Sequence, residues 1–330
     1  MNYLTSKTKM LTMIVTLLAL LIQIQSCEKD GLLSLDNNKE FLPKLSEYKI
    51  FQGNPSDLLP TSDFNYYEIS TQLFTDYAEK QRLIKIPGGS SITATNDLLP
   101  DFPNGTMIVK TFYYFNDKRD PSKGKKIIET RLLIKSGATW NYGTYLWNES
   151  QTEANLITAG LNKTVNWINE SGAVRVISYH IPNSRECVSC HGSGGAIQPI
   201  GPKIRNLNIK VVRGEATLNQ LTYFKNIGIL NALDPSSFST LPNWHDTTLS
   251  IENRARAYLE VNCAHCHNQD GLASRTNLYF SYEIPSNETK IVNRKDQIRK
   301  KMSAGKMPKL GTTIIDEEGL ALIKSYIESL

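Results

Sequence analysis

Several signatures of catalysis and binding are missing from this 330-residue sequence. It has no Ser-His-Asp arrangement, no glycine-rich phosphate loop and no pair of carboxylates at a recognisable catalytic spacing. No basic stripe runs along the chain, which argues against nucleic acid as a partner. Beyond the amino terminus, no apolar run is long enough for a membrane helix. No feature of the sequence therefore demands a substrate pocket.

The amino terminus has the pattern of a secretory signal. Lys7 and Lys9 precede a short apolar run over Met10–Ile24, and a small residue then precedes Cys27. This resembles the lipobox of bacterial lipoproteins, although Gln25 stands where the box usually has a small residue. The alternative is a transmembrane anchor, but a span needs about 20 apolar residues. We expect a signal peptide over 1–26 and lipid attachment at Cys27, which would anchor an exported protein on the periplasmic side or the outer membrane.

The remainder of the chain has an ordinary composition. Removing 1–26 takes away Lys7 and Lys9 and no acid, so the net charge falls from +5 to +3. About 300 residues remain, enough for two modest domains. Residues 27–60 are polar and punctuated by proline, which predicts a tether and lead-in.

Cysteine is scarce, and its placement is the most informative feature. Apart from Cys27, the four cysteines form two pairs, each followed by His: Cys187-Val188-Ser189-Cys190-His191 and Cys263-Ala264-His265-Cys266-His267. The spacing C-x-x-C-H is typical of c-type haem attachment, because two thiols reach the vinyl groups and the next imidazole binds the iron. The sequence predicts two haem c groups, attached at Cys187, Cys190, Cys263 and Cys266, with His191 and His267 as iron ligands.

Cysteine pairs with this spacing also have three other uses. A zinc site takes four Cys, or two Cys with two His, but each pair here already has its own adjacent His. Two disulfides, each within a C-x-x-C, suit an oxidising compartment and leave both His unexplained. A thioredoxin-like redox pair normally occurs once, near a βαβ pattern.

Hydrophobic periodicity divides the chain into two differently built parts. Residues 65–180 favour an antiparallel meander, with strands over Met107–Phe115, Ile127–Ile134, Thr139–Trp147, Val165–Asn169 and Val174–Ile181. Helices are expected over Asn219–Leu230, Asn253–Asn262 and Asp316–Leu330. We predict an α+β two-domain fold: a β-rich first haem domain over 61–245 and an all-α second haem domain over 246–330.

The last 85 residues resemble class I cytochromes c. The order is entry helix, haem motif, a loop with Lys306-Met307-Pro308-Lys309-Leu310-Gly311, and closing helix. The resemblance implies that Met307 is the second axial ligand of the second haem. Met302 is the nearby rival and lacks the following proline.

A wider resemblance covers most of the chain. The segments that carry it are Phe102-Pro103-Asn104-Gly105-Thr106 before the aromatic strand, Pro199-Ile200-Gly201-Pro202-Lys203, and Arg254-Ala255-Arg256-Ala257-Tyr258 before Cys263. They look like an exported diheme c-type cytochrome lipoprotein family. The first domain also resembles the β-sheet cytochromes c-prime, in which the distal side of the haem can be open.

The second ligand of the first haem is not evident. His180 and His245 are candidates, although a packed or surface role suits each better. His265 is expected to point outward, and Lys110 to be a solvated strand lysine.

The sequence favours electron transfer at the cell envelope, through two haems and with redox proteins as partners. The protein is expected to be an electron carrier rather than an enzyme. The alternative is a diheme peroxidase-like or other small-molecule oxidoreductase, or a gas-binding sensor, with an open first haem.

Overall fold

The computed structural model describes residues 41–231 and 234–330. The predicted signal peptide and lipid attachment at Cys27 lie outside these residues and stay predictions. Within the described part, no helix is both long and apolar enough to cross a membrane.

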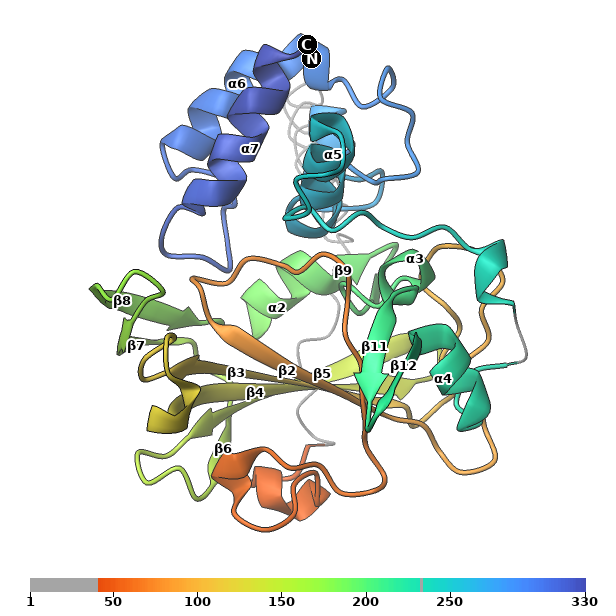
Figure 1. Cartoon of the computed structure of the whole chain (residues 1–330), viewed down its shortest axis with the longest axis vertical. Coiled ribbons are helices and arrows are strands. Elements are labelled where there is room, and N and C mark those ends of the chain that lie inside the picture. Colours follow the sequence, from red (N-terminus) through yellow and green to blue (C-terminus); the bar gives the residue numbers. More distant parts are fainter. Residues whose placement is uncertain (1–40, 232–233) are drawn as a thin grey trace, which may run out of the picture. The chain divides into compact units, whose positions relative to one another are not determined.

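A six-stranded antiparallel meander forms the centre of the fold, with the strands in chain order across the sheet (Figure 1). The strands are β1 (Asn65–Tyr66), β2 (Glu79–Lys85), β3 (Met107–Phe115), β4 (Lys125–Ser136), β5 (Thr139–Trp147) and β6 (Ala154–Ile157). They are rich in β-branched and aromatic residues, which pack well on a pleated surface. A register shift between Phe112 and Tyr113 interrupts the pairing of β3 with β4.

The two faces of this sheet have different neighbours. Successive side chains alternate between faces, so Leu83, Val109 and Leu132 share one face and pack with Phe41 and Leu45 in an apolar cluster. Leu45 begins the 3-10 helix η2 (Leu45–Tyr48), which Figure 1 shows on this side of the sheet.

The opposite face of the sheet adjoins the first C-x-x-C-H motif. On this face the hydroxyl of Tyr142 donates a hydrogen bond of 3.1 Å to the carbonyl of Ser184, the first residue of helix α2 (Ser184–His191). The sheet therefore supports the first motif directly.

Three short hairpins complete the β structure. They are β7 (Leu161–Ile168) with β8 (Val174–Ile181), β9 (Gly192–Ser193) with β10 (Ala196–Ile197), and β11 (Lys210–Arg213) with β12 (Ala216–Asn219). The first hairpin packs Trp167 and Tyr179 against Phe112 and Tyr114 of β3. It thus extends the core beyond the register shift.

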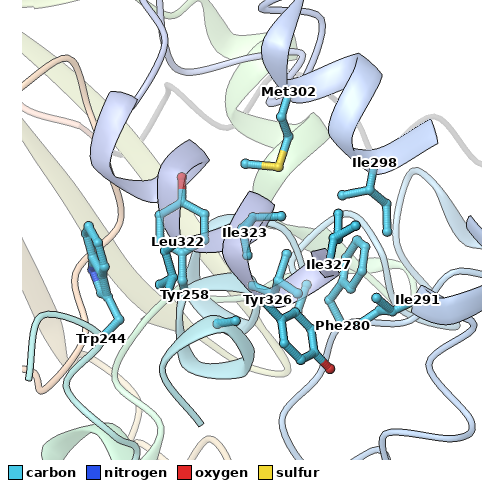
Figure 2. Packing of buried hydrophobic residues seen from close by; sticks show 13 residues of the cluster. Trp244, Tyr258, Phe280, Ile291, Ile298, Met302, Leu322, Ile323, Tyr326 and Ile327 are labelled. Carbon is cyan, nitrogen blue, oxygen red and sulfur yellow. The ribbon is translucent and has the colours of Figure 1, made fainter. Parts of the chain in front are cut away.

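The described part holds six α-helices and several single turns of 3-10 helix. The remaining α-helices are α3 (Ile204–Leu207), α4 (Gln220–Asn226), α5 (Ile251–Asn262), α6 (Ile291–Ser303) and α7 (Glu317–Glu328). The other 3-10 turns are η3 (Pro55–Asp57), η4 (Pro121–Lys123), η5 (Pro235–Ser237) and η6 (Ser274–Thr276). Side chains of α5, α6 and α7 share one apolar cluster, shown in Figure 2.

The predicted fold class is wrong. A separate all-α class I cytochrome c-like domain is not seen, because the described residues belong to one compact, β-rich unit. Long-range hydrogen bonds tie the carboxy-terminal part to the segment between β1 and β2: Thr313, which lies between α6 and α7, donates to the buried carboxylate of Asp76 at 2.7 and 2.9 Å. The backbone N–H of Phe74 likewise donates to the side chain of Asn262 at 2.8 Å. Hydrophobic periodicity reports local helices and does not register such contacts.

The contact between α5 and α7 depends on a glycine. Gly319 lies against the buried ring of Tyr258, and a Cβ atom at position 319 would overlap that ring. We expect Gly319→Ala to lower the free energy of unfolding by about 1–3 kcal/mol, since the helices would have to move apart. Urea unfolding of the full chain measures this.

Gly88→Ala is the matched control. A Cβ at Gly88 meets no atom within 4 Å and the backbone there is not left-handed, so the change should stay within about 0.5 kcal/mol. Equal losses in the two variants would contradict the close approach of α5 and α7.

Candidate functional site

The first C-x-x-C-H motif lies on helix α2. Asn183 caps this helix by accepting a hydrogen bond of 3.0 Å from the backbone N–H of Glu186, whose side chain accepts in return from Asn183 N–H at 2.8 Å. The helix holds Cys187, Cys190 and His191 at positions i, i+3 and i+4. Residues at these steps share one face of a helix, so both thiols and the imidazole project to the same side.

The imidazole of His191 is held in one orientation. Its Nδ1 lies 2.7 Å from the carbonyl oxygen of Gln198, and the backbone N–H of Gln198 donates to the carbonyl of His191 at 2.8 Å. Burial lowers the pKa of His191 to about 4, so the ring is neutral near pH 7. With Nδ1 donating to Gln198, Nε2 keeps the lone pair that a metal needs.

The second motif begins where helix α5 ends. The N–H of Cys263 donates to the carbonyl of Leu259, and the N–H of His267 donates to the carbonyl of Cys263, each at 2.9 Å. These bonds wind Cys263 to His267 into a turn. The ring of His267 packs beside Phe280, with 5.1 Å between the ring centroids. Burial lowers the pKa of His267, which leaves this imidazole neutral as well.

The two motifs meet in space. Sγ of Cys190, Sγ of Cys266 and a ring nitrogen of His265 all lie within 4.8 Å of one another. A hydrogen bond between the two thiols raises the pKa of Cys190 and lowers that of Cys266. All four motif cysteines are free thiols, so neither C-x-x-C pair forms a disulfide in the structure. Burial raises the pKa of Cys187 to about 11 and that of Cys263 to about 12.

A large cavity opens beside each motif. The cavity at the second motif measures about 580 Å³, and that at the first about 480 Å³, both within the range of small-molecule and cofactor sites. We call the larger of the two the second-motif cavity. Its lining includes Cys263, Cys266, His267 and Met307. The first-motif cavity is lined by residues that include His191, Gln198, Gly201 and Asn268. Cys190 and His265 line both.

The two methionines of the carboxy-terminal part occupy different environments. Met302 is 7 % exposed, packs with side chains such as Ile298 and Ile323 in the cluster of α5, α6 and α7 (Figure 2), and also lines the second-motif cavity. Met307 is 38 % exposed and lies on the rim of the second-motif cavity. The side chain of Met307 is therefore less tightly packed than that of Met302.

His180 and His245, the two candidate second ligands of the first haem, have other partners. In His180, Nδ1 lies 2.7 Å from the side chain of Asn162 and Nε2 lies 3.0 Å from the carboxylate of Glu186. His245 stacks on Trp244, with 3.6 Å between the ring centroids, and its side chain is 60 % exposed. Neither lines the first-motif cavity.

Two expectations from the sequence fail at this site. His265 does not point outward: its Nδ1 is buried without a hydrogen-bond partner, between the two cavities. Lys110 is half-buried on β3 rather than fully solvated, and burial lowers its pKa well below the usual range. The sequence signal for His265 was its place inside a motif, whereas nothing local marks Lys110.

The residues present fit covalently held haem. At the second motif, both thiols, the imidazole of His267 and the thioethers of Met302 and Met307 line the cavity. At the first motif, Cys190 and His191 line the cavity, and Cys187 lies one turn earlier on the same helix. The chain was also compared with protein-family models, curated proteins and solved structures, and none of these comparisons gave a match.

Proposed function

We propose that this protein is an exported electron carrier that holds two c-type haems through thioether bonds. The observation that carries the proposal is that two C-x-x-C-H motifs, far apart in the sequence, each border a cofactor-sized cavity. Haem would supply one-electron redox chemistry at both places. The chain's own residues attach it, bind its iron, and set its potential through burial and hydrogen bonds.

Each side chain has a defined task in this proposal. Cys187 with Cys190, and Cys263 with Cys266, form the covalent attachments. The bond from Nδ1 of His191 to Gln198 orients that ring and raises its basicity as a ligand. Met307 would complete the coordination at the second motif, from the rim of its cavity.

The contact between the motifs supports a relay. Sγ of Cys266 lies 3.9 Å from the carbonyl oxygen of Ser189, although the two residues are 77 positions apart in the sequence. Cys190 and His265 form a wall shared by both cavities. An electron passing between the two cofactors would then cross only a few side chains.

A metal-ion site is the second candidate. Cys190, His265 and Cys266 offer two sulfurs and one nitrogen within 4.8 Å, which matches three ligands of a tetrahedral zinc site. The two candidates exclude each other, because a cysteine whose sulfur is in a thioether bond has no thiolate for zinc.

The anchor and partners belong to the same proposal. A lipid on Cys27 would hold the protein at the cell envelope, where its redox partners would be other envelope proteins. We expect Cys27→Ser to release the protein from membranes into the soluble fraction. A variant that is processed and still sediments with membranes would contradict lipid attachment at Cys27.

Mass spectrometry of the denatured full chain tests the cofactor. We expect the mass of two haems to survive acid-acetone extraction, since thioethers do not dissociate. Cys263→Ala with Cys266→Ala should remove one haem, and Cys187→Ala with Cys190→Ala the other. Extraction of free haem, or stoichiometric zinc on an unmodified chain, would overturn the proposal, and zinc would favour the second candidate.

A further inference from the structure

Three cationic side chains stand side by side on the sheet face that adjoins α2. Arg82 of β2 pairs with Lys110 of β3, and Lys110 pairs with Arg131 of β4. Directly opposed residues on neighbouring strands project from the same face, with Cβ atoms about 5 Å apart. We call these three residues the cation row. Lys80, two residues before Arg82, adds a fourth cation to the same face.

The cation row has too few anions of its own. Arg131 is paired with the carboxylate of Glu129. The guanidinium of Arg82 donates to the amide oxygen of Gln72 at 3.1 Å, and Lys80 donates to the carbonyl of Leu73 at 2.8 Å. Among the described residues, Lys110 has no ion-pair partner, and its Nζ lies 5.1 Å from the centroid of the Phe112 ring.

This arrangement is costly without a bound anion. Like charges directly opposite each other destabilise a sheet, and burial makes each unpaired charge more expensive. Burial lowers the pKa of Lys110 well below its usual range, and that of Lys80 to about 7. A negatively charged ligand would relieve both costs.

The row borders the first motif. Arg82 and Lys110 line a small cavity of about 10 Å³, which alone holds one water-sized group, so an anion bound there would extend into the adjoining first-motif cavity. Ile200, Gly201 and Val261 line both this small cavity and the first-motif cavity. An anion held by the row would therefore sit next to the first motif.

We propose that Arg82, Lys110 and Arg131 form an anion site beside the first motif, which binds a carboxylate or a small inorganic oxyanion. The anion has two possible sources. One is a propionate of the first haem, and this source rests on the proposed function. The other is a free oxyanion, which requires no haem.

The test uses the full chain as purified, with Lys110→Met as the main variant. Lys85→Met is the matched control, because Lys85 lies on β2 and is paired with Asp63 at 2.6 Å. Inorganic phosphate and nitrite are titrated by calorimetry. If the anion is free, we expect binding that Lys110→Met weakens at least tenfold, or about 1.4 kcal/mol. Lys110→Arg and Lys85→Met should stay within threefold of the unmodified chain.

If the anion is a propionate, neither free anion binds. Lys110→Met then lowers the midpoint potential of one haem, because loss of a nearby cation disfavours the reduced state. Arg82→Gln should lower the same midpoint potential, and it replaces Lys110→Met as the test variant if Lys110→Met does not fold. The proposal is overturned if the unmodified chain binds no anion and neither variant differs from Lys85→Met in potential. If the purified chain contains no haem, the proposed function fails. The titrations with phosphate and nitrite then decide by themselves whether the anion site exists.

Discussion

Met307→Ala is expected to lower the midpoint potential of the second haem by on the order of 0.1 V and to open its iron to carbon monoxide. Thioether ligation favours ferrous iron, and axial ligands shift haem potentials over a wide range. Met307 is half-exposed at the rim of the second-motif cavity, so shortening its side chain should perturb little packing. Spectroelectrochemistry and carbon monoxide difference spectra measure both effects.

Met302→Ala separates ligation from packing. Met302 lies in the apolar cluster of α5, α6 and α7, and its truncation should cost about 2–5 kcal/mol of unfolding free energy. Its haem potentials and carbon monoxide binding should match those of the unmodified protein. If the two variants gave the same spectra and potentials, Met307 would not be the ligand.

The unmodified protein should bind carbon monoxide at about one haem in two. Both ring nitrogens of His180 have protein partners, and His245 lies away from the first-motif cavity. Only the second-motif cavity has methionine on its wall. An open first iron favours the oxidoreductase and sensor alternatives over a simple carrier, whereas absence of binding at both haems favours electron transfer alone.

Glu129→Gln is expected to give the largest loss of stability, about 3–5 kcal/mol. The carboxylate of Glu129 is fully buried, pairs with Arg131 and accepts a hydrogen bond of 2.7 Å from the hydroxyl of Tyr179. The neutral amide leaves the guanidinium without its counter-charge beneath the first motif. Urea denaturation followed by far-ultraviolet circular dichroism measures the loss.

Glu149→Gln is the control with the same chemical change. Like Glu129, Glu149 forms ion pairs, in this case with Lys126 at 3.0 Å and Lys163 at 2.9 Å. Its side chain, however, is 73 % exposed. Water screens such pairs, so the expected loss is at most about 1 kcal/mol. Equal losses of unfolding free energy in Glu129→Gln and Glu149→Gln would show that Arg131 does not need Glu129 as its counter-charge.

The five strands β3, β4, β5, β7 and β8 and three of the six described α-helices, α4, α5 and α7, could be predicted from local pattern. Those over Met107–Phe115, Thr139–Trp147 and Val174–Ile181 match the predicted ranges, since alternation of apolar and polar residues is a local signal. Helices α2, α3 and α6 were not predicted. Helix α3 has only four residues. Helix α6 is densely charged and buries only Ile291, Ile298 and Met302, so its apolar stripe is too sparse to stand out.

The sequence by itself determined the chemistry that the site can offer, because the spacing of C-x-x-C-H is a local property of five consecutive residues. Only the tertiary structure decided that Cys190 lies against Cys266, and that the carboxy-terminal helices join the sheet in one unit. It also decided that Lys110 lies half-buried in the cation row. Strand register and long-range packing set these contacts, and they depend on residues far apart in the chain, which local periodicity does not encode.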